Sequence, residues 1–118
     1  MTKTAHLFAA ITAVLSLGAA SFAQSADLRA GAAKAKEVCV ACHGLDGNSP
    51  SPDFPKLGGQ HSDYLAHSLQ SYKDGRRRNA IMAGFAAALT KQDIENLAAY
   101  YASQPAVVFV EPYTYKTP

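Results

Sequence analysis

The stretch EVCVACHG, residues 37–44, contains both cysteines of this 118-residue chain, and a histidine follows the second cysteine directly. Cys39, Cys42 and His43 are spaced i, i+3 and i+4, and side chains at this spacing lie on one face of a helix. The spacing therefore predicts that two thiols and one imidazole converge on a single point. Such a cluster could hold a metal ion, act as a thiol redox pair or attach a cofactor covalently.

These three chemistries make different demands on the rest of the chain. A structural zinc site needs four ligands, usually including a second Cys/His pair, but beyond residue 23 the only other histidines are His61 and His67, whose spacing of six does not match. A thioredoxin-like pair would accompany an α/β pattern, whereas a helical pattern precedes Cys39. The sequence C-x-x-C-H is the signature of c-type haem attachment. It favours one covalent haem c with His43 at the iron, while zinc and the redox pair stay open as alternatives.

Residues 1–23 have the features of a secretory signal peptide. Lys3 precedes an apolar stretch from Leu7 to Ala20, and the small residues around Phe22 fit a cleavage site after Ala23. Cleavage after Ala26 is the second possibility, and an uncleaved anchor is the other alternative. The apolar stretch has 14 residues, fewer than the ~20 that a spanning helix needs. We therefore expect export to the periplasm without stable insertion in the membrane.

The remaining chain is small and nearly neutral. Removal of the first 23 residues would leave 95, near the lower limit for a chain that builds its own core. This part is rich in alanine and has no tryptophan, so an apolar cofactor could supply the missing core. Without Lys3, ten Lys and Arg oppose nine Asp and Glu. The single basic run, residues 76–78, is too short to indicate nucleic-acid binding.

Periodicity predicts three helices. Apolar spacing predicts the first over residues 27–39 and a second that starts with Ser62 as N-cap and ends at Gly75. The third should start at Thr90, whose side chain can form a capping box with Asp93, and stop before Pro105.

The segments between these helices complete the expected organisation. Residues 44–59 are rich in proline and glycine and should form a loop, and residues 75–89 should form a glycine- and alanine-rich connection. We expect an all-α domain over residues 24–104, with three to four short helices wrapped around one covalently bound haem. Residues 105–118 form a tail of unknown role.

A haem iron bound by one histidine has a second axial position to fill or to leave open. Beyond residue 23 the only methionine is Met82, and a thioether ligand opposite histidine suits electron transfer because it raises the potential. Methionine is more often a core filler, which is the alternative for Met82. His61 lies one turn before Leu65 and is the rival ligand, whereas His67 should face solvent.

Four segments together resemble the class I c-type cytochromes. They are CVACHG (39–44), PKLGGQ (55–60), YLAHSLQSYKDGRRRN (64–79) and LTKQDIENLAAYYASQ (89–104). The resemblance is to small bacterial monohaem cytochromes and to one repeat of the tandem dihaem periplasmic carriers. It implies a cytochrome c fold, thioethers at Cys39 and Cys42, and iron ligation by His43 and Met82. It also implies that the Pro55 carbonyl accepts a hydrogen bond from His43.

The resemblance suggests further roles, each with a plainer alternative. Gly31 should let the first helix cross close to the last one, against Tyr100 or Tyr101, unless it is simply a residue near a helix start. Tyr64, Gln60 and the run Arg76–Arg78 are candidates to meet the haem propionates, unless they form a solvated face.

These features predict a periplasmic electron carrier, not an enzyme, with one haem and redox proteins as partners. A cytochrome complex, a terminal oxidase or a dehydrogenase would fit. The apolar residues around Met82 (Ala80, Ile81, Gly84, Phe85 and Ala86) could form the docking rim. The alternatives are a subunit of a larger oxidoreductase and a ligand sensor or peroxidase-like enzyme in which Met82 leaves the iron. The sequence does not predict an oligomeric state.

Overall fold

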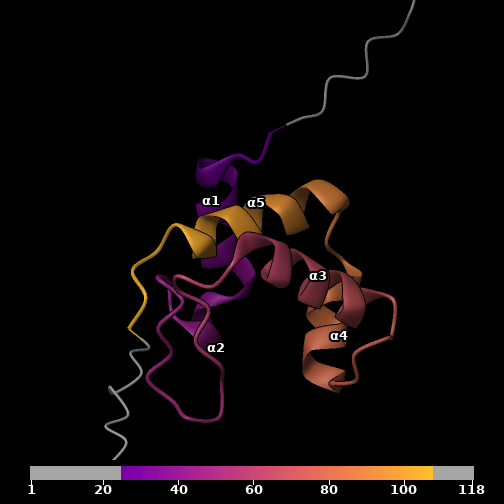
Figure 1. Cartoon of the computed structure of the whole chain (residues 1–118). Helices are drawn as coiled ribbons and strands as arrows, with labels where there is room; N and C mark the ends of the chain where they lie inside the picture. The colour runs from indigo at the N-terminus through magenta and orange to yellow at the C-terminus, as the bar shows by residue number, and fades with distance from the viewer. Residues whose placement is uncertain (1–24, 108–118) are drawn as a thin grey trace, which may run out of the picture.

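The computed structural model describes residues 25–107, and every regular element in that range is a helix, as Figure 1 shows. The five helices are α1 (Leu28–Val38), α2 (Val40–His43), α3 (Ser62–Lys73), α4 (Ala80–Ala87) and α5 (Lys91–Ala102). The predicted all-α class is therefore confirmed. The predicted signal peptide and nearly all of the predicted tail lie outside the described residues.

The first helix begins where the sequence provides a cap. The Asp27 carboxylate accepts hydrogen bonds from the backbone N–H groups of Arg29 at 2.8 Å and Ala30 at 3.2 Å, which satisfies two of the orphan donors at the start of α1. The helix ends at Val38, and Cys39 joins it to the single turn of α2. Helix α1 thus lies within the predicted range of residues 27–39, with Asp27 and Cys39 as its caps.

Helices α1 and α5 cross closely at Gly31, and Figure 1 shows the crossing near the top of the fold. A Cβ atom on Gly31 would lie 2.2 Å from the backbone oxygen of Asn96 and 2.8 Å from the Cβ of Tyr100. Only glycine permits this approach. The prediction that Gly31 lets the two helices meet at Tyr100 is confirmed, and the buried Ala35 continues the contact into the core.

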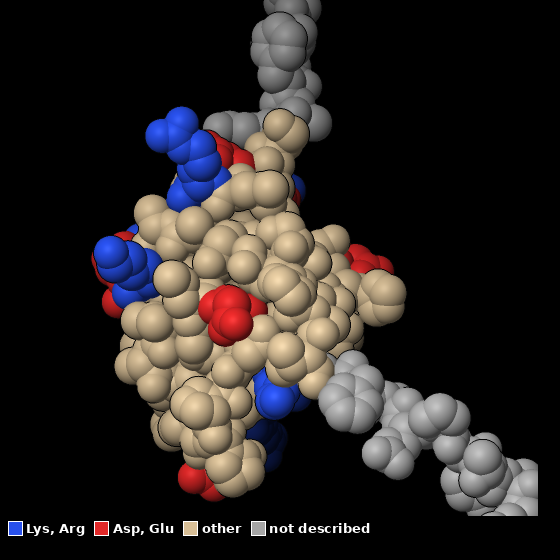
Figure 2. All heavy atoms as spheres, turned by 90° about the vertical axis from the view of Figure 1, so that its left-hand side faces the viewer, with Lys and Arg blue, Asp and Glu red and all other residues tan. Residues whose placement is uncertain are grey.

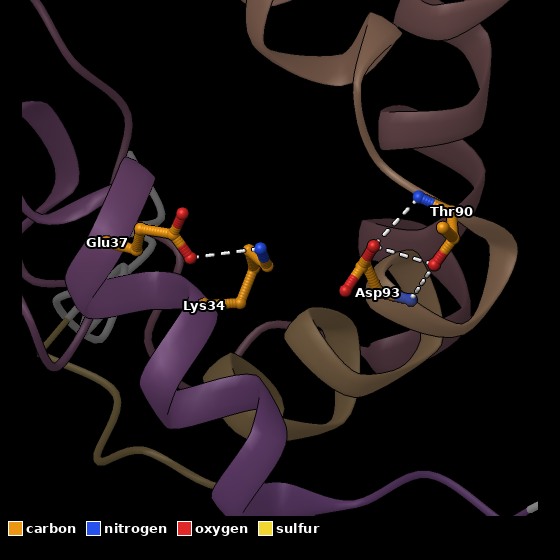
Figure 3. A network of polar contacts seen from close by, with 4 residues as sticks. All are labelled: Lys34, Glu37, Thr90 and Asp93. Carbon is orange, nitrogen blue, oxygen red and sulfur yellow. Dashed lines mark hydrogen bonds and ion pairs between the residues drawn. The ribbon is translucent and has the colours of Figure 1, made fainter.

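The start of α5 has the predicted capping box, drawn in Figure 3. The Asp93 carboxylate accepts from the Thr90 backbone N–H at 2.9 Å and from its hydroxyl at 2.6 Å, and the Thr90 hydroxyl oxygen accepts from the Asp93 N–H at 3.0 Å. The Thr90 hydrogen bonds lower the pKa of Asp93. Figure 3 also shows the ion pair of Lys34 with Glu37, 3.0 Å apart.

Two expectations about the helices were wrong. Residues 75–89 are not a plain connection, because they contain α4. Ser62 is the first residue of α3, and the cap position belongs to His61, which makes no side-chain capping bond. Helix α5 ends at Ala102, with Ser103 as its C-cap, and so stops before Pro105 as predicted.

The existence of α4 has a local explanation. The Asn79 side chain accepts a hydrogen bond from the Met82 N–H at 3.0 Å and so caps the helix. Four of the eight residues of α4 are alanines, and alanine has the highest helix propensity. Gly84 lies within this helix, and a single glycine costs only about 1 kcal/mol relative to alanine.

The loop between α2 and α3 is fixed to the end of α5. The N–H of Gly59 donates to the Tyr101 carbonyl at 3.0 Å, and the Tyr100 hydroxyl donates to the Leu45 carbonyl at 2.8 Å. The Asn48 side chain donates to the Pro105 carbonyl at 3.1 Å. These bonds hold the loop beside the core that α1, α3 and α5 form. The core residues are Ala35, Leu65, Leu89, Ile94, Leu97, Ala98 and Tyr101.

The surface of this domain has mixed charge. Figure 2 shows mostly uncharged side chains on the face at the left of Figure 1, with acidic and basic residues scattered singly or in small groups. The full chain has a formal net charge of +2. Within residues 25–107, no helix is long and apolar enough to cross a membrane.

Candidate functional site

Two cavities lie between the helices and the loop, and they share five lining residues: Cys39, His43, Pro55, Tyr72 and Met82. These residues come from the α1–α2 junction, α2, the following loop, α3 and α4. Figure 1 shows α2 and α4 on opposite sides of the lower half of the fold. Four of these five residues, all except Tyr72, are ones that the sequence singled out, and they surround one common region.

His43 is held in a defined orientation at the end of α2. Its ring is buried, with 6% of its surface exposed, and Nδ1 lies 2.9 Å from the carbonyl oxygen of Pro55. A carbonyl can only accept, so Nδ1 carries the proton and donates it. In the neutral imidazole Nε2 is then the nitrogen that can act as a ligand. The contact expected between His43 and Pro55 is present.

Cys39 and Cys42 are half-buried free thiols. Burial raises the pKa of the Cys39 thiol, and the hydrogen bond with Tyr101 offsets this only in part. A thiol that acts in redox exchange normally has a lowered pKa, because the thiolate is the nucleophile. The environment of Cys39 is therefore unlike that of a thiol switch and fits a cysteine that serves as an attachment point.

Met82 lies half-buried on α4 and lines both cavities. The cap by Asn79 fixes its backbone, since the bond at 3.0 Å joins Asn79 to the N–H of Met82 itself. His61, the rival ligand, is exposed and is not among the residues lining either cavity. His67 is exposed, as expected.

The surface around Met82 only partly matches the expected docking rim. Ile81 is 60% exposed and Phe85 is 47% exposed, and both line the second cavity. Ala86 is completely buried, so it cannot belong to a docking surface. Ala86 is the buried residue of α4, on the side of the helix that faces the protein.

The candidate propionate residues separate into two groups. Gln60, Tyr64 and Arg77 line the first cavity. Arg76 and Arg78 do not line either of the two cavities, and Arg76 is paired with Asp74 at 2.8 Å. The basic run is thus not a single functional unit.

Sequence reasoning missed two residues of this site, Ser68 and Tyr72. Both are on α3, and the Arg77 side chain contacts both: it donates to the Ser68 hydroxyl at 3.2 Å and lies 4.8 Å from the centre of the Tyr72 ring. Ser68 is buried, which is uncommon for serine. The sequence feature that could have indicated them is their spacing of four residues, which places Ser68 and Tyr72 on one face of the helix.

The residues around these cavities fit a covalent haem c. Two free thiols lie at the cavity wall, and the buried imidazole has one nitrogen committed to a carbonyl and the other free. The remaining wall of the first cavity is largely apolar, with Leu57, Leu65, Leu69, Leu97 and Ala98. An apolar plate with an iron at its centre matches this combination of side chains.

Comparison with known proteins gives the family. The cytochrome c family matches residues 28–104. Cytochrome c4 of Pseudomonas aeruginosa is 48% identical over 95 residues, covering 80% of this chain and 47% of that protein. The crystal structure of reduced recombinant cytochrome c4 from Pseudomonas stutzeri superposes with a TM-score of 0.66 at 43% identity, covering 75% of this chain and 51% of that one.

A thiosulfate dehydrogenase from Marichromatium purpuratum is also similar, with a TM-score of 0.65 at 32% identity. The match covers 87% of this chain and 26% of that one. This chain spans about half the length of the cytochrome c4 relatives that it matches. By its sequence match over residues 28–104 and by its fold, this chain belongs to the cytochrome c family, the electron-transfer proteins that carry covalent haem c.

Proposed function

We propose that the chain is an exported electron carrier with one haem c. Cys39 and Cys42 would hold the haem through thioethers, and His43 and Met82 would be the axial ligands of its iron. The observation that carries this proposal is that Cys39, His43 and Met82 all line both of the two cavities. When bound, the haem supplies reversible one-electron chemistry.

The residues around the haem site would orient it and adjust its potential. The Pro55 carbonyl accepts the hydrogen bond from Nδ1 of His43, so Nε2 would be the nitrogen that binds the iron. The Met82 thioether would favour the reduced state and, with His43, leave no open coordination position. With both positions filled, electron transfer is favoured over ligand binding or peroxidase-like chemistry.

The ligand assignment can be tested by absorption spectroscopy of both redox states. Wild-type ferric protein should show the weak far-red band of a methionine–iron bond, and Met82→Ala should lose it. His61→Ala serves as the matched control and should keep the band. A Met82→Ala protein that retains the band would refute the assignment, and loss of the band in His61→Ala would transfer the role to His61.

Export to the periplasm is part of the same proposal. It is supported by the signal-peptide pattern of residues 1–23. We expect N-terminal sequencing of the purified protein to begin at Gln24, or at Asp27 if cleavage follows Ala26. A protein that still begins at Met1 would contradict cleavage.

A second candidate is a subunit, or a dedicated electron acceptor, of a larger oxidoreductase. It is favoured by the similarity to the thiosulfate dehydrogenase from Marichromatium purpuratum, of which this chain matches 26%. A free carrier should purify as a small species by size-exclusion chromatography from its native source. Stable co-purification with a dehydrogenase would favour the subunit instead.

A further inference from the structure

Phe54 makes a second contact with the imidazole of His43, beside the hydrogen bond to Pro55. The two ring centroids lie 6.3 Å apart and the ring planes are inclined by 68°, which is the edge-to-face arrangement that aromatic pairs prefer. Phe54 is half-buried and lines the second cavity together with Met82. Its ring is therefore part of the wall that surrounds the buried imidazole.

Short-range hydrogen bonds fix the turn that presents Phe54. The buried Ser49 hydroxyl donates to the Ser51 carbonyl at 3.2 Å. The Ser51 hydroxyl donates to the Asp53 carboxylate at 3.3 Å and accepts from the Asp53 N–H at 3.2 Å. The Phe54 N–H then donates to the Ser51 carbonyl at 3.4 Å. Serine and aspartate side chains that bond to the nearby backbone stabilise such turns, so the position of Phe54 is set locally.

The loop that contains this turn is closed at its base. The N–H groups of Leu57 and Gly58 both donate to the Gly47 carbonyl, at 2.7 and 3.2 Å. The backbone of Phe54 is further restricted because a proline follows it. Both contacts with the imidazole thus come from consecutive residues, Phe54 and Pro55, on a loop whose ends are joined.

The hydrogen bond to Pro55 alone does not determine the plane of the imidazole. It fixes where Nδ1 of His43 lies, 2.9 Å from the carbonyl oxygen, but the ring could still turn about the line between these two atoms. Such a turn would change the 68° angle to the Phe54 ring and disturb the edge-to-face contact. The two contacts together therefore fix both the position and the plane of the imidazole.

We propose that Phe54 is a positioning residue that keeps the imidazole plane of His43 fixed over the haem in both redox states. The inference rests on the proposed function, because it requires an iron bound at Nε2 of His43. A ligand that is already oriented needs little rearrangement when an electron arrives or leaves. In the ferric state the imidazole plane governs how the unpaired spin is distributed over the haem ring, so the plane can be measured.

Proton NMR of the ferric holoprotein provides the direct test, because the shifts of the haem methyl groups depend on this plane. Phe54→Leu removes the ring but keeps an apolar side chain, and it should alter the spread of these shifts. Phe54→Tyr keeps the ring and should restore the wild-type pattern. Phe85→Leu is the matched control, since Phe85 also lines the second cavity but forms no aromatic pair within residues 25–107. Unchanged shifts in Phe54→Leu, or an equal change in Phe85→Leu, would overturn the proposal.

A second readout separates the orientation of His43 from a general loosening of the loop. Exchange of its Nδ1 proton with solvent requires the bond to Pro55 to open, so Phe54→Leu should speed this exchange about twofold to tenfold, the size of a lost aromatic pair. The Leu57 N–H, bound to the Gly47 carbonyl at the base of the loop, should exchange at the wild-type rate. Equal acceleration of both protons would contradict the positioning role and leave Phe54 as a residue that only holds the loop together.

The two levels of inference fail separately. Wild-type protein without a haem spectrum would defeat the proposed function and this inference together. A normal far-red band with wild-type methyl shifts in Phe54→Leu would overturn only the role of Phe54. If Phe54→Leu does not accumulate, Phe54→Met, which also lacks a ring, is measured in its place, and the same outcomes decide.

Discussion

Gly31→Ala should loosen the crossing of α1 and α5, because the new methyl group has no space. Its Cβ would lie 2.2 Å from the Asn96 backbone oxygen, whereas ordinary van der Waals contact begins at 3.4 Å. The two helices would have to separate by about 1.2 Å at this point. The Asn96 oxygen is a backbone atom, so no side-chain rotation can relieve this clash. The same shift would strain the 2.8 Å bond from the Asp27 N–H to the Asn96 side chain.

The size of the effect follows from two opposing terms. Overpacking costs about 1–3 kcal/mol, and a backbone clash of this size belongs at the upper end. Alanine gains about 1 kcal/mol over glycine within a helix. The net loss of unfolding free energy should be about 2 kcal/mol, which lowers Tm by roughly 8–16 °C in a domain of this size.

Guanidinium unfolding of the oxidised holoprotein, followed by circular dichroism, measures this loss. The midpoint should fall while the slope m stays unchanged. Gly84→Ala is the matched control, because Gly84 is also within a helix but a Cβ there would meet no atom within 4 Å. That variant should gain about 0.5–1 kcal/mol. A Gly31→Ala protein as stable as wild type would refute the reasoning.

Three further predictions concern the cap of α4, the cap of α5 and the exposed face of α4. Asn79→Ala removes the side-chain cap that binds the Met82 N–H and should lower the free energy of unfolding by about 1 kcal/mol. On heating, its far-red band should disappear at a lower temperature than that of Thr90→Ala, which loses a similar cap away from the iron. Equal temperatures in the two variants would contradict a role of Asn79 in placing Met82. The pKa of Asp93 is lowered by Thr90, so its contribution to stability is present above its unfolded pKa of about 3.9 and is lost as pH falls through the lower folded value. Asp93→Asn should therefore flatten the loss of stability in acid below about pH 4, and an unchanged acid profile of the midpoint would argue against it. Ile81→Glu puts a charge on a residue that is 60% exposed beside the second cavity and should slow electron exchange with a redox partner in stopped-flow experiments without altering the spectrum. Leu28→Glu, at an exposed site on α1, should not slow it, and equal rates in the two variants would contradict docking at Ile81.

Local chemistry made several features predictable. The spacing of the C-x-x-C-H motif is enough to predict that its three side chains lie close together, because residues three and four apart share a helical face. The capping box of Thr90 and Asp93 spans only four residues, and both partners are visible in the sequence. Gly31 could be predicted because the resemblance supplied a reason for a close helix crossing.

Features that depend on contacts between distant segments were not predictable in the same way. Helix α4 was missed because its eight residues are all apolar or glycine, so they show no amphipathic period that would mark a helix. Nothing in the run Arg76–Arg78 indicated which arginine would face the cavity. The difference arises in the folded chain, where Arg76 forms an ion pair with Asp74. Arg77 instead donates a hydrogen bond to Ser68 and lies over the ring of Tyr72.

The central claim is that the helical turn containing Cys39 and Cys42 carries a covalent haem. Intact-mass measurement of the exported protein, made under denaturing conditions, tests this most directly. We predict the mass of the chain from Gln24, or from Asp27, plus one haem, with no thiol that reacts with an alkylating reagent. Bare polypeptide with two alkylatable cysteines would contradict it.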